Sequence, residues 1–338
     1  MSKGDAPAGR ASVRPTLKEV AKAAGVSLAS ASYAVNGAGS VGEATRAHVL
    51  KVAAELGYRP NASAKAMKTG RTHAIGLIVP DLTNPFFPSL AQVVIQAARA
   101  QGYSVLLTDT EGSPQSELTA VDLLVRQGVD GVVWFPIDDT GPVQRLIRGV
   151  PAVVLDRALD GYDVVQADYA QGGALAADHL LDLGHTRIGV ITGPYAASSA
   201  RQRAEAAIAR IQARGSLAWT VSNAFSVDLE PDVRTALASS TATGIICGAD
   251  LIAIGAMREL RRIGVPVPEQ VSVIGFDDIP WAQWHAPALS TIEMPVEEMG
   301  EAAVERLLHR MANPQEPHRR LVFKVGLAAR ESTGPSPP

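Results

Sequence analysis

The chain has 338 residues, of which 46% are hydrophobic and 19% are charged. That length favours a small domain joined to a larger α/β body, and the apolar content argues against disorder except at the ends. The single cysteine, Cys247, excludes an internal disulfide framework, and no Cys/His spacing indicates structural zinc.

No run of residues is long and apolar enough to span a bilayer, and residues 1–15 lack the apolar stretch of a secretion signal. We therefore expect a cytoplasmic protein. Charge is unevenly distributed: residues 1–70 hold 10 basic and 4 acidic residues, which leaves 21 basic and 30 acidic residues in the remainder. A basic N-terminal segment on an acidic body is typical of a nucleic-acid-binding head.

Three short helices are predicted between residues 16 and 59. Thr16 and Glu19 form a capping box for the first, and Ser27 can cap a second that runs to about Asn36. Two such helices around a glycine-containing turn are the helix-turn-helix pattern, whose second helix enters the major groove of DNA. A three-helix bundle that does not bind DNA is the alternative.

The third helix is expected from about Glu43 to Leu56, and its predicted buried face consists of Val49, Val52, Ala53 and Leu56. Pro60 stops the preceding helix, and the segment 61–70 is too short to form a stable helix by itself. We expect this segment to fold only when docked on DNA, with Lys65 and Lys68 on phosphates and Met67 as an apolar wedge in the minor groove. A plain alanine-rich linker is the alternative.

The motifs TLKEVAKAAGVS, VNG, ELGYRPNASAKAMKTGRTHAIGLIVP and DLTNPFF resemble the lac repressor (LacI/GalR) family in order and spacing. The similarity continues to about Arg330. It implies that the second helix reads an operator, that a hinge helix enters the minor groove, and that dimers bind pseudo-palindromic sites. The DNA-binding residues implied or predicted are Thr16, Ser27, Leu28, Ala29, Ser30, Ser32, Tyr33, Asn36, Tyr58, Asn61, Ala64, Lys65, Met67 and Lys68.

Several residues depart from the family's pattern. Tyr33 stands where the family very often has Arg, so a bidentate contact to guanine is not available there. Met67 replaces the usual hinge Leu, and Gly42 replaces a usual Ser before the third helix. These changes affect the operator sequence rather than the mode of binding.

From Ala74 onward, short β-branched runs alternate with amphipathic stretches, which predicts parallel sheets wrapped by crossover helices. The predicted strands are Ile75–Val79, Ser104–Thr108, Gly131–Phe135, Ala152–Leu155, Ile188–Ile191, Gly244–Cys247 and Ser272–Gly275. Because so long a run exceeds one sheet, the predicted fold is an all-α helix-turn-helix headpiece plus a periplasmic-binding-protein-like α/β body of two doubly wound parallel-sheet lobes.

The expected boundaries are a disordered arm over 1–15, the helix-turn-helix domain over 16–59, a hinge over 60–71 and the body over 72–330. One lobe is expected from 72–166 plus 292–319, and the other from 167–291 plus 320–330. We expect residues 331–338 to form a disordered tail.

Ligands of such folds bind beyond the carboxyl ends of the strands, here between the lobes. Aromatic rings with carboxylates and amides at those ends suit a polyhydroxylated ligand. The residues predicted there, partly by resemblance to the family's effector-contacting positions, are Asn84, Phe86, Phe87, Asp156, Ser199, Arg203, Phe225, Asp250 and Asp277. Alternatives remain: the two Phe residues could be core, Asp250 could cap a helix, and Asp156 with Arg157 could form an ion pair between the lobes.

The residues after Arg203 lack the family's usual Gly-aromatic pair, which disfavours a purine-type ligand and favours a sugar. The sequence thus predicts a DNA-binding transcriptional regulator, a repressor by family precedent, that acts as a homodimer, is switched by a sugar-like effector and uses no cofactor or metal. A periplasmic-type sugar-binding protein and an enzyme are the rivals. Against an enzyme, there is no nucleophile elbow, phosphate-cradling loop or metal-ligand spacing, and His185 is expected to be structural.

Overall fold

The computed structural model describes residues 15–37, 39–59, 70–137, 147, 149–157, 159–239 and 241–337. The chain divides into two compact units, Met1–Thr72 and His73–Pro338. The predicted hinge residues Asn61, Ala64, Lys65, Met67 and Lys68 lie outside the described residues, as does most of the predicted N-terminal arm.

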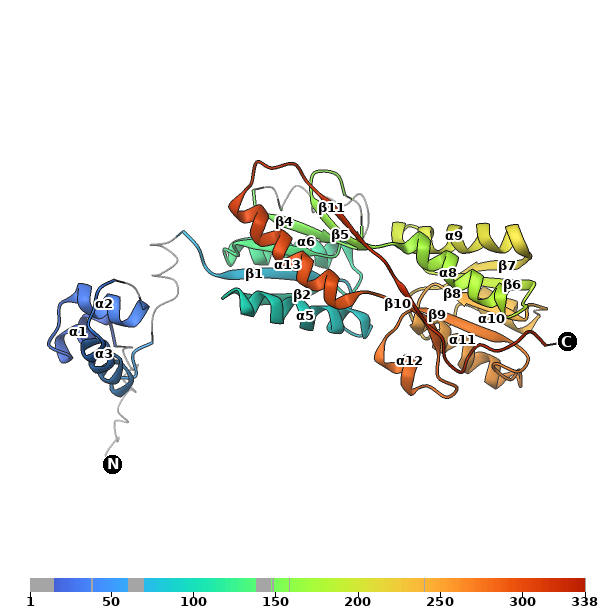
Figure 1. Cartoon of the computed structure of the whole chain (residues 1–338), viewed down its shortest axis with the longest axis horizontal. Helices are drawn as coiled ribbons and strands as arrows, with labels where there is room; N and C mark the ends of the chain where they lie inside the picture. The colour runs from blue at the N-terminus through green and yellow to red at the C-terminus, as the bar shows by residue number, and fades with distance from the viewer. Residues whose placement is uncertain are drawn as a thin grey trace, which may run out of the picture. The chain divides into compact units, whose positions relative to one another are not determined.

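The described part of the first unit contains three helices, α1 (Leu17–Ala23), α2 (Leu28–Asn36) and α3 (Glu43–Glu55) (Figure 1). Its core is small: Val20, Ala21, Ala24, Ala31, Ala34, Val49 and Ala53. The short side chains let the helices approach closely. The predicted burial of Leu56 is wrong, because it follows the last turn of α3 and is 41% exposed.

The second unit contains two six-stranded sheets, which form its two lobes. The first sheet has the order β11-β5-β4-β3-β1-β2 and the second β12-β10-β9-β8-β6-β7, and only β12 runs antiparallel to its neighbour. The strands of the first sheet are β1 (Ala74–Val79), β2 (Ser104–Asp109), β3 (Gly131–Trp134), β4 (Ala152–Leu155), β5 (Asp163–Ala167) and β11 (Arg320–Phe323). Those of the second are β6 (Arg187–Thr192), β7 (Ser216–Ser222), β8 (Gly244–Cys247), β9 (Ser272–Asp277), β10 (Ser290–Glu293) and β12 (Gly326–Ala328).

Helices cover both faces of each sheet (Figure 1). In the first lobe, α5 (Phe86–Ala100) and α13 (Val296–Ala312) pack on one face, and α6 (Pro114–Arg126) packs on the other. In the second lobe, α8 (Tyr169–Asp182) and α9 (Ser198–Arg214) face α10 (Pro231–Ala238) and α11 (Asp250–Arg262) across the sheet. The short helix α12 (Pro280–Trp284) follows β9. The predicted fold, a helical headpiece with a body of two parallel-sheet lobes, is confirmed.

The alternation of side chains along β1 explains why its sequence is apolar throughout. Ile75 and Leu77 point toward α5 and α13, whereas Ile78 points toward α6. Because successive residues of a strand face opposite sides, a strand covered on both faces must be apolar at nearly every position. Six of the seven predicted strands were visible as apolar runs for this reason; the exception is β2, an edge strand whose residues are exposed or half-buried.

The chain crosses between the sheets after β5, after β10 and after β11. The C-terminal segment, red in Figure 1, runs from the first lobe to the second. The assignment of 320–330 to the second lobe is therefore wrong for β11, which pairs with β5 in the first sheet, while β12 does lie in the second. Five strands, β5, β7, β10, β11 and β12, were not predicted, because most are short or carry polar residues at alternate positions.

Residues 331–337 differ from the predicted disordered tail. Ser332 is fully buried: its hydroxyl accepts from Ser290 N at 2.8 Å and donates to Val273 O at 2.6 Å. The Gly334 carbonyl lies 3.0 Å from His185 Nε2. These partners lie about 40 to 150 residues away in sequence, so no local pattern signals the packing. His185 is structural in this arrangement, and burial lowers its pKa.

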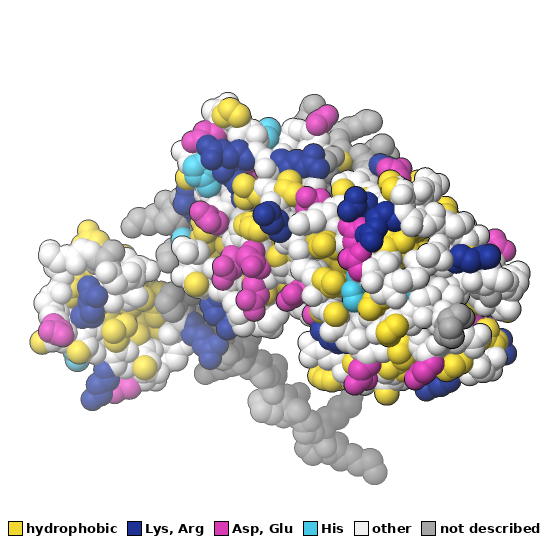
Figure 2. Space-filling view, turned by 45° about the vertical axis from the view of Figure 1, so that its right-hand side comes forward, with side chains coloured by type: hydrophobic (Ala, Val, Ile, Leu, Met, Phe, Trp, Pro, Cys, Tyr) yellow, Lys and Arg dark blue, Asp and Glu magenta, His cyan; other side chains and the backbone are white. Residues whose placement is uncertain are grey.

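Within the described part of the chain, no helix is long and apolar enough to cross a membrane. Cys247 is buried in β8, and burial raises the pKa of its thiol. On the face of the molecule in Figure 2, Lys and Arg side chains are interspersed with Asp and Glu side chains over the second unit.

Candidate functional site

The first helix of the headpiece begins with the predicted capping box. Glu19 N donates to Thr16 Oγ1 at 3.4 Å, and Thr16 N donates to Glu19 Oε2 at 2.6 Å. The hydrogen bonds that Thr16 N and Thr16 Oγ1 donate to Glu19 Oε2 lower the pKa of Glu19. Val26 is half-buried against the core, so it fills the corner of the turn.

Helix α2 is capped by Ser27, whose hydroxyl accepts from Ser30 N at 3.0 Å. Its inner face is Ala31 and Ala34, and these small residues hold the helix close to α1 and α3. Its outer face is exposed, with Leu28 52% and Tyr33 46% accessible to solvent. Ala29 and Asn36 are also exposed, whereas Ser30 and Ser32 are half-buried. The sequence-predicted DNA-reading residues of α2 therefore share one outward side.

Two of these side chains have partners within the headpiece. Asn36 Nδ2 donates to Ser32 O at 2.9 Å, which orients the amide along the helix. The Tyr33 ring lies against Gly39, where an added Cβ would come within 2.7 Å of the ring, so glycine is needed for this contact. Tyr58, predicted to contact DNA, is half-buried against the helical core. Gly42 gives α3 no side-chain cap, as expected.

In the second unit, polar side chains from the two lobes meet at the carboxyl end of β4. Asp156, directly after β4, has the left-handed backbone value φ +74°. Ser199 Oγ of α9 donates to Asp156 Oδ2 at 2.9 Å, and Tyr169 Oη of α8 donates to Asp156 Oδ1. Burial and the Asp156 charge raise the pKa of Tyr169 well above its usual value. Tyr169 was not predicted, because the strand before it was missed.

Arg203, also on α9, continues this cluster. Its guanidinium donates to Asp277 Oδ1 at 3.1 Å and to Gly248 O at 2.8 Å. The guanidinium carbon lies 3.9 Å from the ring centre of Phe276 and 4.8 Å from that of Tyr169, which is cation–π geometry. Arg203 Nε is buried and has no hydrogen-bond partner among the described residues. A polar ligand atom could satisfy this donor.

Asp277 lies at the end of β9, with φ +117°. Its pKa is raised to about 7: burial raises it most, the Arg203 charge and hydrogen bond lower it, and the Asp156 charge raises it. At neutral pH this carboxyl is poised between its two protonation states. We refer to Asp156, Tyr169, Ser199, Arg203 and Asp277 as the interlobe network.

Asp250 lies behind the interlobe network and is fully buried. Its Oδ2 accepts from Ile279 N at 2.9 Å and its Oδ1 accepts from Thr291 Oγ1 at 2.5 Å. Neither α11, which begins at Asp250, nor α12 has a side-chain cap, so the capping alternative considered for Asp250 is wrong. Gly275 makes room for it, since a Cβ there would come within 2.1 Å of Asp250 Oδ1. Asp250 thus positions the loop after β9.

The remaining predicted residues lie at other strand ends. Asn84 is buried and its Oδ1 accepts from Phe86 N at 3.1 Å. Phe86 is a core residue, which is the alternative given for it from the sequence. Phe87 is half-buried and packs edge-on against Phe86 and Phe135. Phe225 is half-buried over Gly193, where a Cβ would meet its ring at 2.4 Å.

Close packing of α8 on α9 sets the position of the interlobe network. An added Cβ at Gly173 would come within 2.0 Å of Arg203 O, so the helices touch at backbone level. A narrow cavity beside this contact is lined by Thr192, Arg203, Gly248 and Phe276, among others. Arg157 Nε donates to Pro136 O at 2.6 Å, a contact within the first lobe.

No group of three or more His, Cys, Asp or Glu side chains in the described ranges is arranged to hold a metal ion. The site is therefore one of hydrogen-bonding carboxylates, a guanidinium and hydroxyls, flanked by aromatic rings. Such a set can bind and orient a polar molecule, and the nucleophile and metal constellations of an enzyme do not occur in it.

Comparison with known proteins identifies both units. Residues 16–61 match the profile described as bacterial regulatory proteins, lacI family, and residues 177–333 match that of the periplasmic binding protein-like domain. The chain is 36% identical to the HTH-type transcriptional regulator MalR of Streptomyces coelicolor, covering 95% of this chain and 97% of that protein. It is 35% identical to the ribose operon repressor of Escherichia coli K12, covering 94% and 99%.

Among solved structures, the lac repressor dimer bound to operator and the anti-inducer ONPF superposes with a TM-score of 0.86 at 27% identity. The match covers 95% of this chain and 100% of that one. These relatives are regulators and repressors rather than enzymes. With both units matched and one relative 36% identical over nearly its full length, the chain belongs to the lacI family of bacterial regulatory proteins.

Proposed function

We propose that this protein is a sequence-specific transcriptional repressor that binds a pseudo-palindromic operator as a homodimer and is switched by a sugar or sugar derivative. The observation that carries the proposal is the interlobe network. One carboxylate, Asp156, comes from the first lobe, and the groups that contact it or lie beside it come from the second.

The chemistry of the interlobe network suits vicinal hydroxyl groups. A sugar hydroxyl both donates and accepts, so one hydroxyl could donate to Asp156 or Asp277 while accepting from Arg203. The unpartnered Nε of Arg203 is a further donor. Phe87 and Phe225, each half-buried near a strand end, are the rings that we assign to the apolar C–H faces of the ligand. The ribose operon repressor among the relatives supports a sugar over other polar ligands.

Ligand binding would replace contacts that now join the lobes. Ser199 and Tyr169 both donate to Asp156, so a hydroxyl that binds Asp156 competes with an interlobe hydrogen bond. The relative position of the lobes then depends on occupancy. A coupling of about 1–3 kcal/mol between ligand and DNA would change operator affinity some 5- to 150-fold.

For DNA recognition we assign the outer side of α2 to the major groove. Leu28 and Ala29 suit thymine methyl groups, and Tyr33 and Asn36 supply polar groups. Thr16 and Ser27, at the starts of α1 and α2, suit phosphate contacts. The hinge residues Ala64, Lys65, Met67 and Lys68 are proposed to bind the minor groove and its phosphates, and the protein to act in the cytoplasm.

The test is a binding-site selection from genomic DNA with the purified full-length protein, repeated with individual sugars added. We expect a short palindrome to be enriched, and one sugar to alter its enrichment. Asp156→Asn should retain the palindrome and lose the sugar response. Absence of any enriched sequence would contradict the DNA-binding assignment, and a sugar response that survives Asp156→Asn would contradict the interlobe site.

A further inference from the structure

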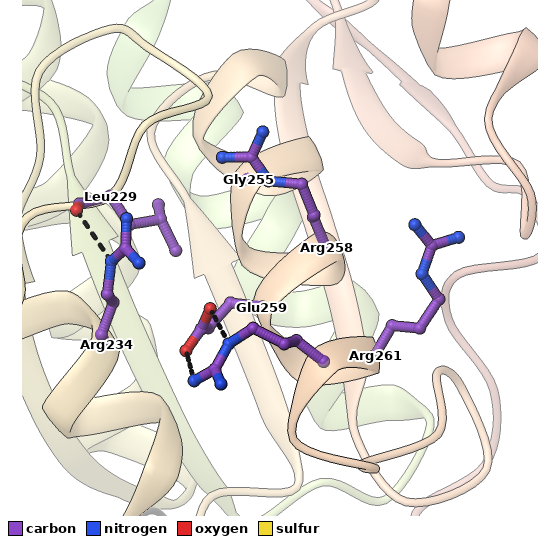
Figure 3. A pocket seen from close by; sticks show the side chains of 7 residues that line it. Leu229, Arg234, Gly255, Arg258, Glu259 and Arg261 are labelled. Atoms are coloured by element: carbon purple, nitrogen blue, oxygen red, sulfur yellow. Dashed lines mark hydrogen bonds and ion pairs between the residues drawn. The ribbon is translucent and has the colours of Figure 1, made fainter.

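The second lobe holds a hollow on the face opposite α8 and α9, between α10 and α11. Its volume is about 580 Å³, within the range of small-molecule sites. Four of its lining side chains are arginines, Arg234 from α10 and Arg258, Arg261 and Arg262 from α11. Figure 3 shows Arg258, Glu259 and Arg261 on α11, with Arg234 across from Glu259.

The charges around this hollow are not balanced by the protein. Glu259 is bound by Arg262 through two hydrogen bonds of 2.7 and 2.9 Å, and the exposed Asp228 pairs with Arg258 at 3.2 Å. In the described ranges, Arg234 and Arg261 form no ion pair. Two guanidinium groups without a direct ion pair therefore border one hollow, with Glu259 attracting Arg234 at longer range, on a body that carries more acidic than basic residues.

Helix electrostatics does not explain the arrangement. Arg261 and Arg262 lie in the last turn of α11, where cations interact well with the helix dipole. Arg258 lies one turn earlier, and Arg234 belongs to another helix. Like charges three and four residues apart on one helix repel each other, and of Arg258, Arg261 and Arg262 only Arg261 has no carboxylate partner among the described residues.

Backbone contacts hold the guanidinium groups in place. Arg234 Nε donates to Leu229 O at 3.1 Å, and Arg258 Nη2 donates to Val227 O at 2.8 Å. The loop that carries these carbonyls packs on α11 at Gly255, where a Cβ would come within 2.5 Å of Val227 O. The terminal nitrogens of Arg234 remain available, as does the whole guanidinium of Arg261. Positioned guanidinium groups with spare N–H donors match the geometry of phosphate oxygens.

We propose that this hollow is a second ligand site, which binds the phosphoryl group of a small phosphorylated metabolite or of inorganic phosphate. It is separate from the interlobe network. Asp250, beside that network, is the first residue of α11, while the three arginines of α11 lie 8 to 12 residues later, about 12–18 Å along the helix axis.

The test measures binding of inorganic pyrophosphate to the full-length protein by calorimetry, at ionic strength held constant with potassium chloride. We expect saturable binding that weakens at least about 10-fold in the double variant Arg234→Gln/Arg261→Gln. The matched control is Arg99→Gln/Arg126→Gln, which removes two exposed arginines from the first lobe and should leave the affinity within about two-fold. All four side chains are exposed, so both variants should keep the wild-type melting temperature.

Further titrations identify the ligand and separate this site from the interlobe one. Glucose 6-phosphate binding that depends on Arg234 and Arg261, with weaker orthophosphate binding, would identify a phosphorylated metabolite; the reverse order would identify free phosphate. The affinity for glucose itself should be the same in the wild type and in Arg234→Gln/Arg261→Gln. Equal weakening of pyrophosphate binding by both double variants, or by neither, would overturn the proposal, because the binding would then be general charge attraction or reside elsewhere.

Discussion

Ser199 Oγ donates a 2.9 Å hydrogen bond to Asp156 Oδ2, and this contact joins helix α9 of the second lobe to the end of strand β4 in the first. The two residues are 43 positions apart in sequence. Asp156 reaches this position through a left-handed backbone conformation, which is uncommon for a residue with a side chain. Strained backbone of this kind is often retained at functional sites.

Replacing Ser199 should strengthen effector binding, because its hydroxyl competes with the sugar for Asp156. Ser199→Ala removes this competing donor from the Asp156 carboxylate, and a hydrogen bond to a charged group contributes about 1.5–3 kcal/mol. We expect a roughly 10- to 100-fold gain of sugar affinity, measured by calorimetry with the sugar found in the selection. Ser239→Ala is the control, because its exposed hydroxyl on the far side of the lobe bonds only to its own helix. An unchanged sugar affinity in Ser199→Ala would show that Ser199 takes no part in effector binding.

Asp277 should make folding stability depend on pH. Its pKa is raised from 3.8 to about 7 in the folded protein, so between these values the folded state binds more protons than the unfolded state. Stability from this group is therefore present at low pH and is lost as pH rises from about 4 toward 7, on the order of a few kcal/mol in total.

The measurement is urea unfolding of the wild type and Asp277→Asn between pH 4.5 and 7.5. The difference between the two unfolding free energies should shift in favour of the variant as pH rises, because the variant cannot ionise at this position. Taking the difference cancels titrating groups that do not interact with Asp277, such as His185. A pH-independent difference would show that Asp277 has an ordinary pKa.

Tyr33 should determine part of the operator sequence. It is exposed on the outer side of α2, where its ring rests on Gly39. Tyr33→Arg should introduce a preference for guanine at one position of each half-site, since a bidentate arginine–guanine contact discriminates by about 1–3 kcal/mol. Repeating the binding-site selection with the variant gives the result directly. An identical enriched sequence for variant and wild type would place Tyr33 away from the bases.

The C-terminal segment should contribute to the stability of the second lobe. Ser332→Ala leaves the buried Ser290 N without its partner and removes the donor to Val273 O. We expect a loss of about 1–3 kcal/mol in urea unfolding. Ser336→Ala is the matched control, because its hydroxyl contacts only Pro337 O. Equal stability of the two variants would mean that the tail is not held by Ser332.

Local features could be read from the sequence because the residues that make them are close together along the chain. The capping residues Thr16, Glu19 and Ser27 act within one turn, and both caps, the Thr16–Glu19 capping box and the Ser27 cap, formed as predicted. Strands buried on both faces, such as β1 and β8, showed as uninterrupted apolar runs. From these elements the headpiece, the two lobes and the edge that carries the polar residues could be predicted.

Tertiary structure decided what each polar residue contacts. Asp156, Ser199, Arg203 and Asp277 form a network through contacts that span 43 to 74 residues, whereas Asp250, with the same side chain and the same strand-end position, is buried under α12. The edge strand β11 and the tail around Ser332 likewise depend on distant partners. Hydrogen-bond partners of buried polar groups are set by which segments the packed sheets bring together, and sequence spacing carries no information on that.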